Sequence, residues 1–144
     1  MNCLFSKADP NTICEVIKLT KDWESEKITY GLVSGSADNY TNMDIWICTC
    51  QSEVIAYAAG NKYENELCVF SEKAYFELEE IYVKPAYRNR GIGTKLFRYV
   101  ESEIKAEGIN QLLLSSANKD FDRTVRFYQK LGMNTWTVSF FKTI

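Results

Sequence analysis

Histidine is absent from this 144-residue sequence. Its absence excludes Ser-His-Asp and Cys-His nucleophilic catalysis, and also the common zinc sites that use histidine ligands. If the chain is an enzyme that moves protons, its general base must therefore be a carboxylate, a tyrosine, a cysteine, a lysine or a water chain.

An excess of positive charge and long apolar runs are also missing. The net charge of −2 argues against a nucleic-acid-binding protein, which usually carries a basic excess. No apolar run approaches the roughly 18 residues of a membrane span. The first ten residues show no charged leader followed by a long apolar stretch, so no secretory signal is predicted. We expect a cytoplasmic protein without a membrane or nucleic-acid partner.

The five cysteines do not form a metal-binding pattern. They are scattered and odd in number, which favours reduced thiols. Cys48 and Cys50 are the one close pair, and no second pair accompanies them. We therefore predict no metal site. The length and the 46% hydrophobic content fit a single domain over residues 1–144.

The hydrophobic pattern predicts alternating helices and strands. Asp9-Pro10 is typical of a helix start, with Asp9 as the cap. The Gly-, Ser- and Asn-rich residues 31–42 predict a loop, either a plain surface connection or a cover for a substrate. This order predicts an α/β (α+β) domain whose mixed, mostly antiparallel central sheet is flanked by helices. The expected helices are 10–27, 91–107 and 120–131, and the expected strands are 2–6, 43–50, 53–59, 66–71, 74–83, 111–116 and 133–142.

Residues 88–94, RNRGIGT, lie between an expected strand and an expected helix. Glycines let backbone amides approach an anion, and a helix N-terminus favours negative charge. The segment does not fit a Walker loop, and Leu96 stands where a dinucleotide fingerprint needs its third glycine. Two interpretations remain, which are a site for some other phosphate-bearing ligand and a tight turn with an exposed basic rim.

Arg88-x-x-Gly91-x-Gly93 resembles the coenzyme A motif of the GNAT superfamily of N-acetyltransferases. The resemblance extends over residues 76–133, where LLL at 112–114 and FYQKLGM at 127–133 are similar to that superfamily's fifth strand and following helix. It implies acetyl-CoA as co-substrate. It also implies a coenzyme site whose strand residues pair with the pantetheine arm and whose loop residues hold the pyrophosphate. The strand residues are Ile81, Tyr82 and Val83; the loop residues are Arg88, Asn89, Arg90, Gly91, Ile92, Gly93 and Thr94, with Asn118 near the next helix.

Glu77, Glu79 and Glu80 lie in an expected strand, where glutamate is disfavoured. Strict alternation places Glu77 and Glu79 on one face and Glu80 on the other, unless a bulge intervenes. They are either solvated or ion-paired residues, or a general base that also attracts a cationic amine. LEEIYV at 78–83 is similar to the polyamine acetyltransferase pattern, and Glu77 matches the position of the base in other GNAT enzymes. We favour Glu80 and Glu79, followed by Glu77.

Tyr128 occupies the place where the superfamily carries a tyrosine that protonates the sulfur of coenzyme A. The alternative is a core aromatic with a tethered hydroxyl. The resemblance implies acetyl transfer to a primary amine by direct attack in a ternary complex, with a small polyamine- or aminoglycoside-like acceptor. Acetylation of a protein N-terminus or lysine, and a non-catalytic acyl-CoA-binding module, remain open. A homodimer is expected by analogy alone.

Overall fold

The structure is a computed structural model that describes residues 2–144. Within them, a five-stranded sheet has the order β1-β2-β3-β4-β5. Strands β1 to β4 are antiparallel, and β5 runs parallel to β4. This confirms the mixed, mostly antiparallel sheet. The elements are β1 (Cys3–Lys7), α1 (Ile13–Glu26), α2 (Ala37–Tyr40), β2 (Asp44–Cys50), β3 (Glu53–Glu64), β4 (Ala74–Val83), η1 (Pro85–Tyr87), α3 (Ile92–Ala106), β5 (Leu112–Leu114) and α4 (Phe121–Lys130).

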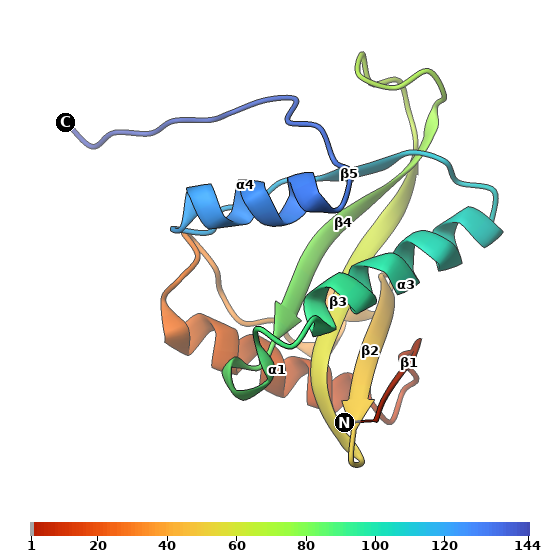
Figure 1. Ribbon diagram of the computed structural model, residues 1–144, viewed down its shortest axis with the longest axis vertical. Coiled ribbons are helices and arrows are strands. Elements are labelled where there is room, and N and C mark those ends of the chain that lie inside the picture. The colour runs from red at the N-terminus through yellow and green to blue at the C-terminus, as the bar shows by residue number, and fades with distance from the viewer. Residues whose placement is uncertain (1) are drawn as a thin grey trace.

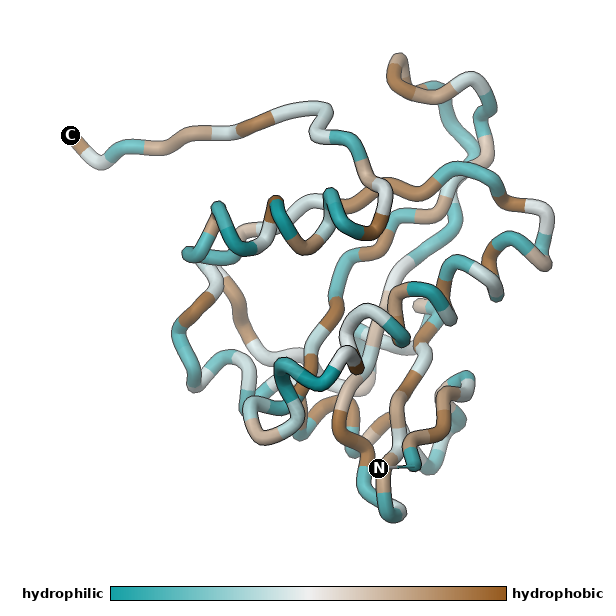
Figure 2. Tube along the Cα trace, viewed as in Figure 1, coloured by the Kyte–Doolittle hydropathy of each residue, from teal (hydrophilic) through white to brown (hydrophobic). Residues whose placement is uncertain are grey.

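Helices cover both faces of the sheet (Figure 1). On one face, Val16 and Leu19 of α1 and Tyr40 of α2 pack against β2, β3 and β4. On the other, α3 packs against Trp46 and Phe76 of the sheet. The helices alternate hydrophobic and hydrophilic positions in Figure 2, as expected for helices with one buried side. No helix among residues 2–144 is both long and apolar enough to cross a membrane.

Several of the expected elements differ in the structure. Helix α1 begins at Ile13 rather than at residue 10, because the Asp9 carboxylate accepts from the backbone N–H groups of Asn11 and Thr12, each at 2.9 Å, and holds a turn there. The expected loop 31–42 contains the short helix α2, whose entry is fixed by a 2.7 Å bond from the Ser36 N–H to Asn39 Oδ1. The expected strand 66–71 is absent, and β3 instead continues to Glu64.

The prediction of a strand or strand pair over residues 133–142 is also wrong. Residues 133–144 have no regular structure, and the chain end extends away from the body of the molecule (Figure 1). Alternating apolar residues fit a strand only when a neighbouring strand pairs with them. Here Trp136, Val138 and Phe140 keep 46%, 47% and 92% of their surface exposed. The segment therefore has the pattern of a strand without a partner.

The pairing of β3 with β4 is interrupted by a one-residue bulge. Ala59 is opposite Glu80 and Gly60 is opposite Leu78, so Glu79 is the extra residue. Only glycine fits at position 60, because a Cβ there would lie 2.1 Å from the backbone oxygen of Glu77.

Strands β4 and β5 pair over a short distance and then separate. Their last pair is Leu78 with Leu114, whereas β4 continues to Val83. The far end of the gap is bridged by the chain that follows α1, since the Tyr30 N–H donates to the Ala117 oxygen at 2.9 Å. Thr29 and Asn118 form an isolated bridge at the same place. The bulge thus coincides with the point where the sheet opens.

Candidate active site

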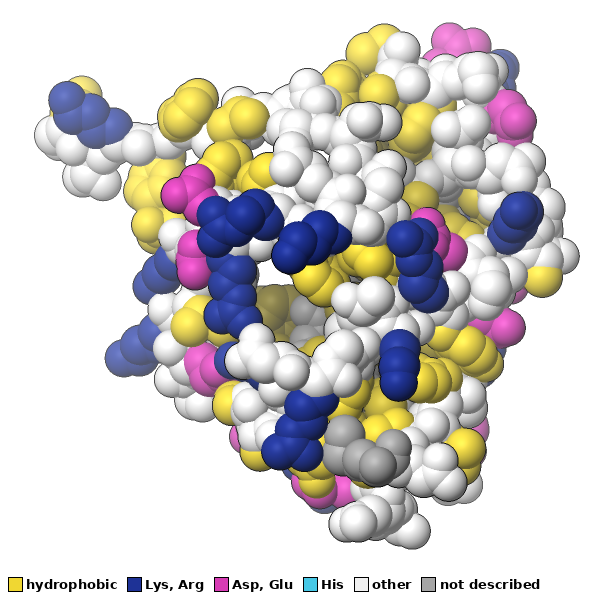
Figure 3. Space-filling model, in the orientation of Figure 1, with side chains coloured by type: hydrophobic (Ala, Val, Ile, Leu, Met, Phe, Trp, Pro, Cys, Tyr) yellow, Lys and Arg dark blue, Asp and Glu magenta, His cyan; other side chains and the backbone are white. Residues whose placement is uncertain are grey.

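A cavity of about 870 Å³ occupies the gap between β4 and β5. It is bounded by the end of β4, the loop leading into α3, residues 115–120, α4 and the segment that follows α1. Figure 3 shows a hollow on this face of the molecule with Lys and Arg side chains gathered around it. The lining includes Lys27, Lys119 and Arg123, which suit an anionic ligand, and also Glu79 and Glu80, which lie at the bulge.

The edge of β4 exposes backbone groups to this cavity. The Lys84 N–H donates to the Ile55 oxygen of β3 at 2.9 Å. Because backbone groups alternate in direction along a strand, those of Tyr82 also face β3, and those of Ile81 and Val83 face the gap. The Val83 oxygen already accepts from Arg88 Nε at 2.9 Å.

The loop before α3 has the backbone geometry of an anion cradle. Asn89 and Gly91 have φ values of +60° and +76°, and α3 begins directly afterwards at Ile92. The unpaired amides of the first turn of α3 therefore point toward the cavity. Residues Asn89, Gly91, Ile92, Gly93 and Thr94 all line the cavity.

The two arginines of this loop have different surroundings. Arg90 does not line the cavity, and its guanidinium lies 5.8 Å from the ring centroid of Tyr87. Arg88 lines the cavity, but its guanidinium forms an ion pair with Glu26 at the end of α1, with a 2.7 Å contact. No sequence pattern indicates this pair, because the two residues are 62 positions apart.

Helix α4 closes the cavity opposite the loop. Arg123, which sequence reasoning missed, donates from Nη2 to Asn89 Oδ1 at 3.2 Å and so connects α4 to the loop. Its position in the first turn of the expected helix 120–131 was the available signal. Asn118 also lines the cavity, but its side-chain oxygen accepts from the Asp120 N–H at 2.8 Å and holds the turn before α4.

The bulge brings the three glutamates to one side of the sheet. Glu80 lies opposite Ala59 and Glu77 opposite Asn61, two positions apart on β3, so both side chains share a face. The Glu79 carboxylate also reaches this face and accepts from Asn61 Nδ2 at 2.9 Å. Glu79 and Glu80 line the cavity, whereas Glu77 lies outside it. The strict alternation considered from sequence is therefore wrong, and the bulge alternative is correct.

Glu80 is held by two tyrosines that the sequence did not identify. Its Oε2 accepts from the Tyr40 hydroxyl at 2.8 Å and from the Tyr57 hydroxyl at 2.9 Å. Burial raises the pKa of Glu80 above its ordinary value, although both hydrogen bonds oppose the shift. Burial and the charge of Glu79 together raise the pKa of Glu77. Glu80 therefore combines a fixed orientation with increased basicity.

Tyr128 lines the cavity from α4. Its ring packs against Phe127 and Phe97, with centroids 5.1 and 6.2 Å away. Among the hydrogen bonds of residues 2–144, none ties down its hydroxyl. Burial raises the pKa of Tyr128 to about 12. The hydroxyl therefore stays protonated at neutral pH and can donate to a ligand atom in the cavity.

The family model described as the acetyltransferase (GNAT) family matches residues 11–133. The chain belongs to this family. The family is one of acetyltransferases. The resemblance seen in residues 76–133 is thereby confirmed.

A thialysine N-epsilon-acetyltransferase of Bos taurus is 38% identical over 60 residues, which cover 42% of this chain. The match spans only 35% of that relative's length. The aminoglycoside acetyltransferase AAC(6')-Iy, solved with the bisubstrate analog CoA-S-monomethyl-acetylneamine, superposes with a TM-score of 0.77 at 15% identity, covering 100% of this chain and 99% of that one. A predicted acetyltransferase of Clostridium acetobutylicum, solved with acetyl-CoA, superposes with a TM-score of 0.72 at 18% identity, covering 99% of this chain and 96% of that one. At these identities the two structures establish the fold.

Proposed function

We propose that this GNAT enzyme acetylates a primary amine on a small cationic acceptor, polyamine- or aminoglycoside-like, by direct attack in a ternary complex. The observation that carries the proposal is the position of Glu79 and Glu80. Both carboxylates line the cavity at the bulge, where β4 separates from β5 and its backbone edge becomes free for the coenzyme. A carboxylate pair at this place attracts a cationic amine to the acetyl group.

In the proposed complex, the pantetheine arm pairs with the backbone groups of Ile81 and with the N–H of Val83, whose oxygen is already occupied by Arg88. The amides of residues 89–94 cradle the pyrophosphate at the N-terminus of α3. This arrangement places the thioester beside the bulge and below Tyr128. Holding both substrates in this geometry supplies a large part of the rate enhancement, because no covalent enzyme intermediate is needed.

An alkylammonium has a pKa of roughly 10, so the acceptor must lose a proton before it attacks. Glu80 takes this proton, directly or through a water molecule, and its raised pKa makes it a better base. The nitrogen–carbon bond forms, backbone N–H groups stabilise the oxyanion, and the carbon–sulfur bond breaks. Tyr128 donates its proton to the departing thiolate, and the second proton, which the new amide nitrogen loses, returns to Tyr128 through solvent.

The similar proteins support a small amine acceptor. One relative is a thialysine acetyltransferase, and the structural neighbours include aminoglycoside acetyltransferases. A protein N-terminus or lysine would be acetylated by the same chemistry, and a non-catalytic module would bind acetyl-CoA without turnover.

We also propose a homodimer, supported by the exposed apolar chain end after residue 133.

The decisive experiment is a panel of amines incubated with enzyme and acetyl-CoA, with thiol release followed over time. The panel contains polyamines, aminoglycosides, free lysine analogues and peptides with a free N-terminus or an internal lysine. We expect release to depend on a small polycationic amine. Release with peptides alone would favour a protein acetyltransferase. Tight acetyl-CoA binding without turnover on any amine would favour the module.

A further inference from the structure

The guanidinium of Arg88 is already occupied in the free protein. Its Nη1 and Nη2 donate to the two carboxylate oxygens of Glu26, each at 2.7 Å, and its Nε donates to the Val83 oxygen at 2.9 Å. A two-pronged pair of this kind fixes the orientation of both side chains. Both are partly buried, with 28% of the Arg88 and 19% of the Glu26 side chain exposed, so solvent screens the pair only in part.

Aromatic side chains complete the arrangement around the pair. The Tyr82 hydroxyl donates to Glu26 Oε2 at 2.6 Å, and the Arg88 guanidinium lies 5.3 Å from the Tyr82 ring centroid. The Trp23 ring stacks on the Tyr82 ring with centroids 5.3 Å apart, and Trp23 Nε1 donates to Thr29 Oγ1 at 3.0 Å. The end of α1, the end of β4 and the segment after α1 therefore form one packed unit beside the cavity.

The charges within this unit compensate each other. Burial opposes the ionisation of Glu26, but the hydrogen bonds from Arg88 and Tyr82 outweigh it and lower the pKa of this carboxyl. The hydrogen bond from Glu26 raises the pKa of Arg88. Both groups are thus charged at neutral pH. The positive charge of Arg88 is compensated by Glu26, so Arg88 would attract a phosphate only weakly.

We propose that Glu26 is a positioning residue for acetyl-CoA, acting through Arg88. Glu26 holds the guanidinium against the Val83 oxygen, and this contact sets the path of the chain from the end of β4 to the loop before α3. The coenzyme is then bound by backbone amides on a loop of fixed shape, and Arg88 contributes shape rather than charge to the pyrophosphate. This inference rests on the proposed coenzyme site.

The alternative role of Arg88, a direct phosphate ligand, makes opposite predictions. If Glu26 merely competes with phosphate for the guanidinium, then Glu26→Gln frees Arg88 and acetyl-CoA binds more tightly. If Glu26 positions Arg88, then the same change loosens the loop and acetyl-CoA binds less tightly. Arg88→Lys is equally informative, because lysine keeps the charge but cannot form the two-pronged pair.

The experiment measures acetyl-CoA affinity by calorimetry, together with kcat and KM, for wild type, Glu26→Gln, Arg88→Lys and the double variant. We expect each single change to weaken binding about tenfold, with kcat nearly unchanged, as for loss of a charged hydrogen bond. The double variant should be no weaker than either single one, because both changes break the same unit. Glu24→Gln is the matched control, an exposed carboxylate two residues earlier on α1, and should bind as wild type.

Tighter binding in Glu26→Gln, or wild-type binding in Arg88→Lys, would overturn the positioning role and make Arg88 a phosphate ligand. Additive losses in the double variant would also overturn it. Thermal unfolding of each variant separates a local effect from general instability. If the Tm of Glu26→Gln falls, Glu26→Asp replaces it, and we expect this variant also to bind acetyl-CoA less tightly than wild type. If the wild-type protein itself fails to bind acetyl-CoA, the proposed coenzyme site fails rather than this inference.

Discussion

The Tyr128 hydroxyl faces the cavity, and no hydrogen bond within residues 2–144 ties it down. We predict that Tyr128→Phe lowers kcat by about 100-fold, the usual contribution of a general acid, and leaves KM for acetyl-CoA nearly unchanged. Steady-state kinetics with a saturating amine test this. Full activity of the variant would reassign Tyr128 to a packing role on α4.

The hydrogen bonds to Glu80 make a pH-dependent prediction. The base must be ionised, so the rate falls as the pH drops through the pKa of Glu80, which burial has raised. Tyr40→Phe removes a donor that favours the ionised form, so the pKa rises further and the acidic limb of the kcat/KM profile moves to higher pH. Profiles of wild type and variant measure the shift.

Tyr63→Phe is the matched control, because Tyr63 donates to Glu79 rather than to Glu80, at 3.3 Å. Its acidic limb should stay where the wild-type limb lies. If the limb moves in Tyr63→Phe and stays in Tyr40→Phe, Glu79 is the base.

The three glutamates were visible in the sequence, but their ranking depended on partners from α2 and β3. A tyrosine 40 positions away from its carboxylate leaves no local pattern.

The bulge between β3 and β4 determines where those carboxylates lie. We predict that Gly60→Ala lowers the free energy of unfolding by about 3 kcal/mol, because its Cβ would lie 2.1 Å from the Glu77 oxygen and the sheet must shift. Acetyl transfer should fall with it, since Glu79 and Glu80 move with the strand. Urea unfolding and the amine assay measure the two effects.

Gly31→Ala provides the comparison. Gly31 has a φ of +68° but open space around its Cβ position, so alanine there costs about 1 kcal/mol of backbone strain without a clash. An equal loss of stability in both variants would argue against the steric account of the bulge.

The helices and most strands could be predicted because their hydrophobic spacing is local. The buried residues of α3, for example, follow the expected helical period. The sequence allows a bulge in this strand but does not decide for it, because one inserted residue changes the face of every side chain beyond it while the composition stays the same. The loop before α3 was recognisable from its glycines, whereas the Glu26 partner of Arg88 came from a distant helix.

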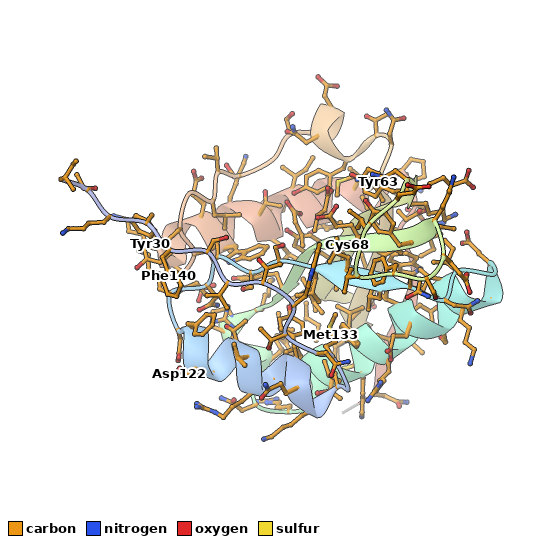
Figure 4. All side chains as sticks on the ribbon, turned by 90° about the horizontal axis from the view of Figure 1, so that it is seen from above. Tyr30, Tyr63, Cys68, Asp122, Met133 and Phe140 are labelled. Atoms are coloured by element: carbon orange, nitrogen blue, oxygen red, sulfur yellow. The ribbon has the colours of Figure 1, made fainter. Side chains whose placement is uncertain are left out.

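The chain end makes a prediction about assembly. Figure 4 shows it leaving the region of Met133 and passing Tyr30, with Phe140 nearby. The chain end contacts the rest of the protein through Phe141, whose ring centroid lies 5.1 Å from that of Tyr30. We predict that removing residues 134–144 converts the proposed dimer into a monomer while the remaining fold persists, because a second copy would cover the exposed apolar side chains.

Light scattering after size exclusion measures this change in mass, and circular dichroism checks the fold. A full-length protein with Trp136→Ser and Phe140→Ser should dissociate in the same way. A full-length chain that is monomeric at all concentrations, or a truncated chain that remains dimeric, would contradict the prediction.

The separation of β4 from β5 has a consequence for the dynamics of the free enzyme. Beyond Leu78, β4 is a sheet edge inside the molecule, and the N–H groups of Ile81 and Val83 have no strand beside them. In deuterated water we expect these two amides to exchange quickly in the free protein and slowly once acetyl-CoA is bound. The Tyr82 amide, which faces β3, should exchange slowly in both states. The coenzyme would then act as a temporary strand that protects the edge while it is bound.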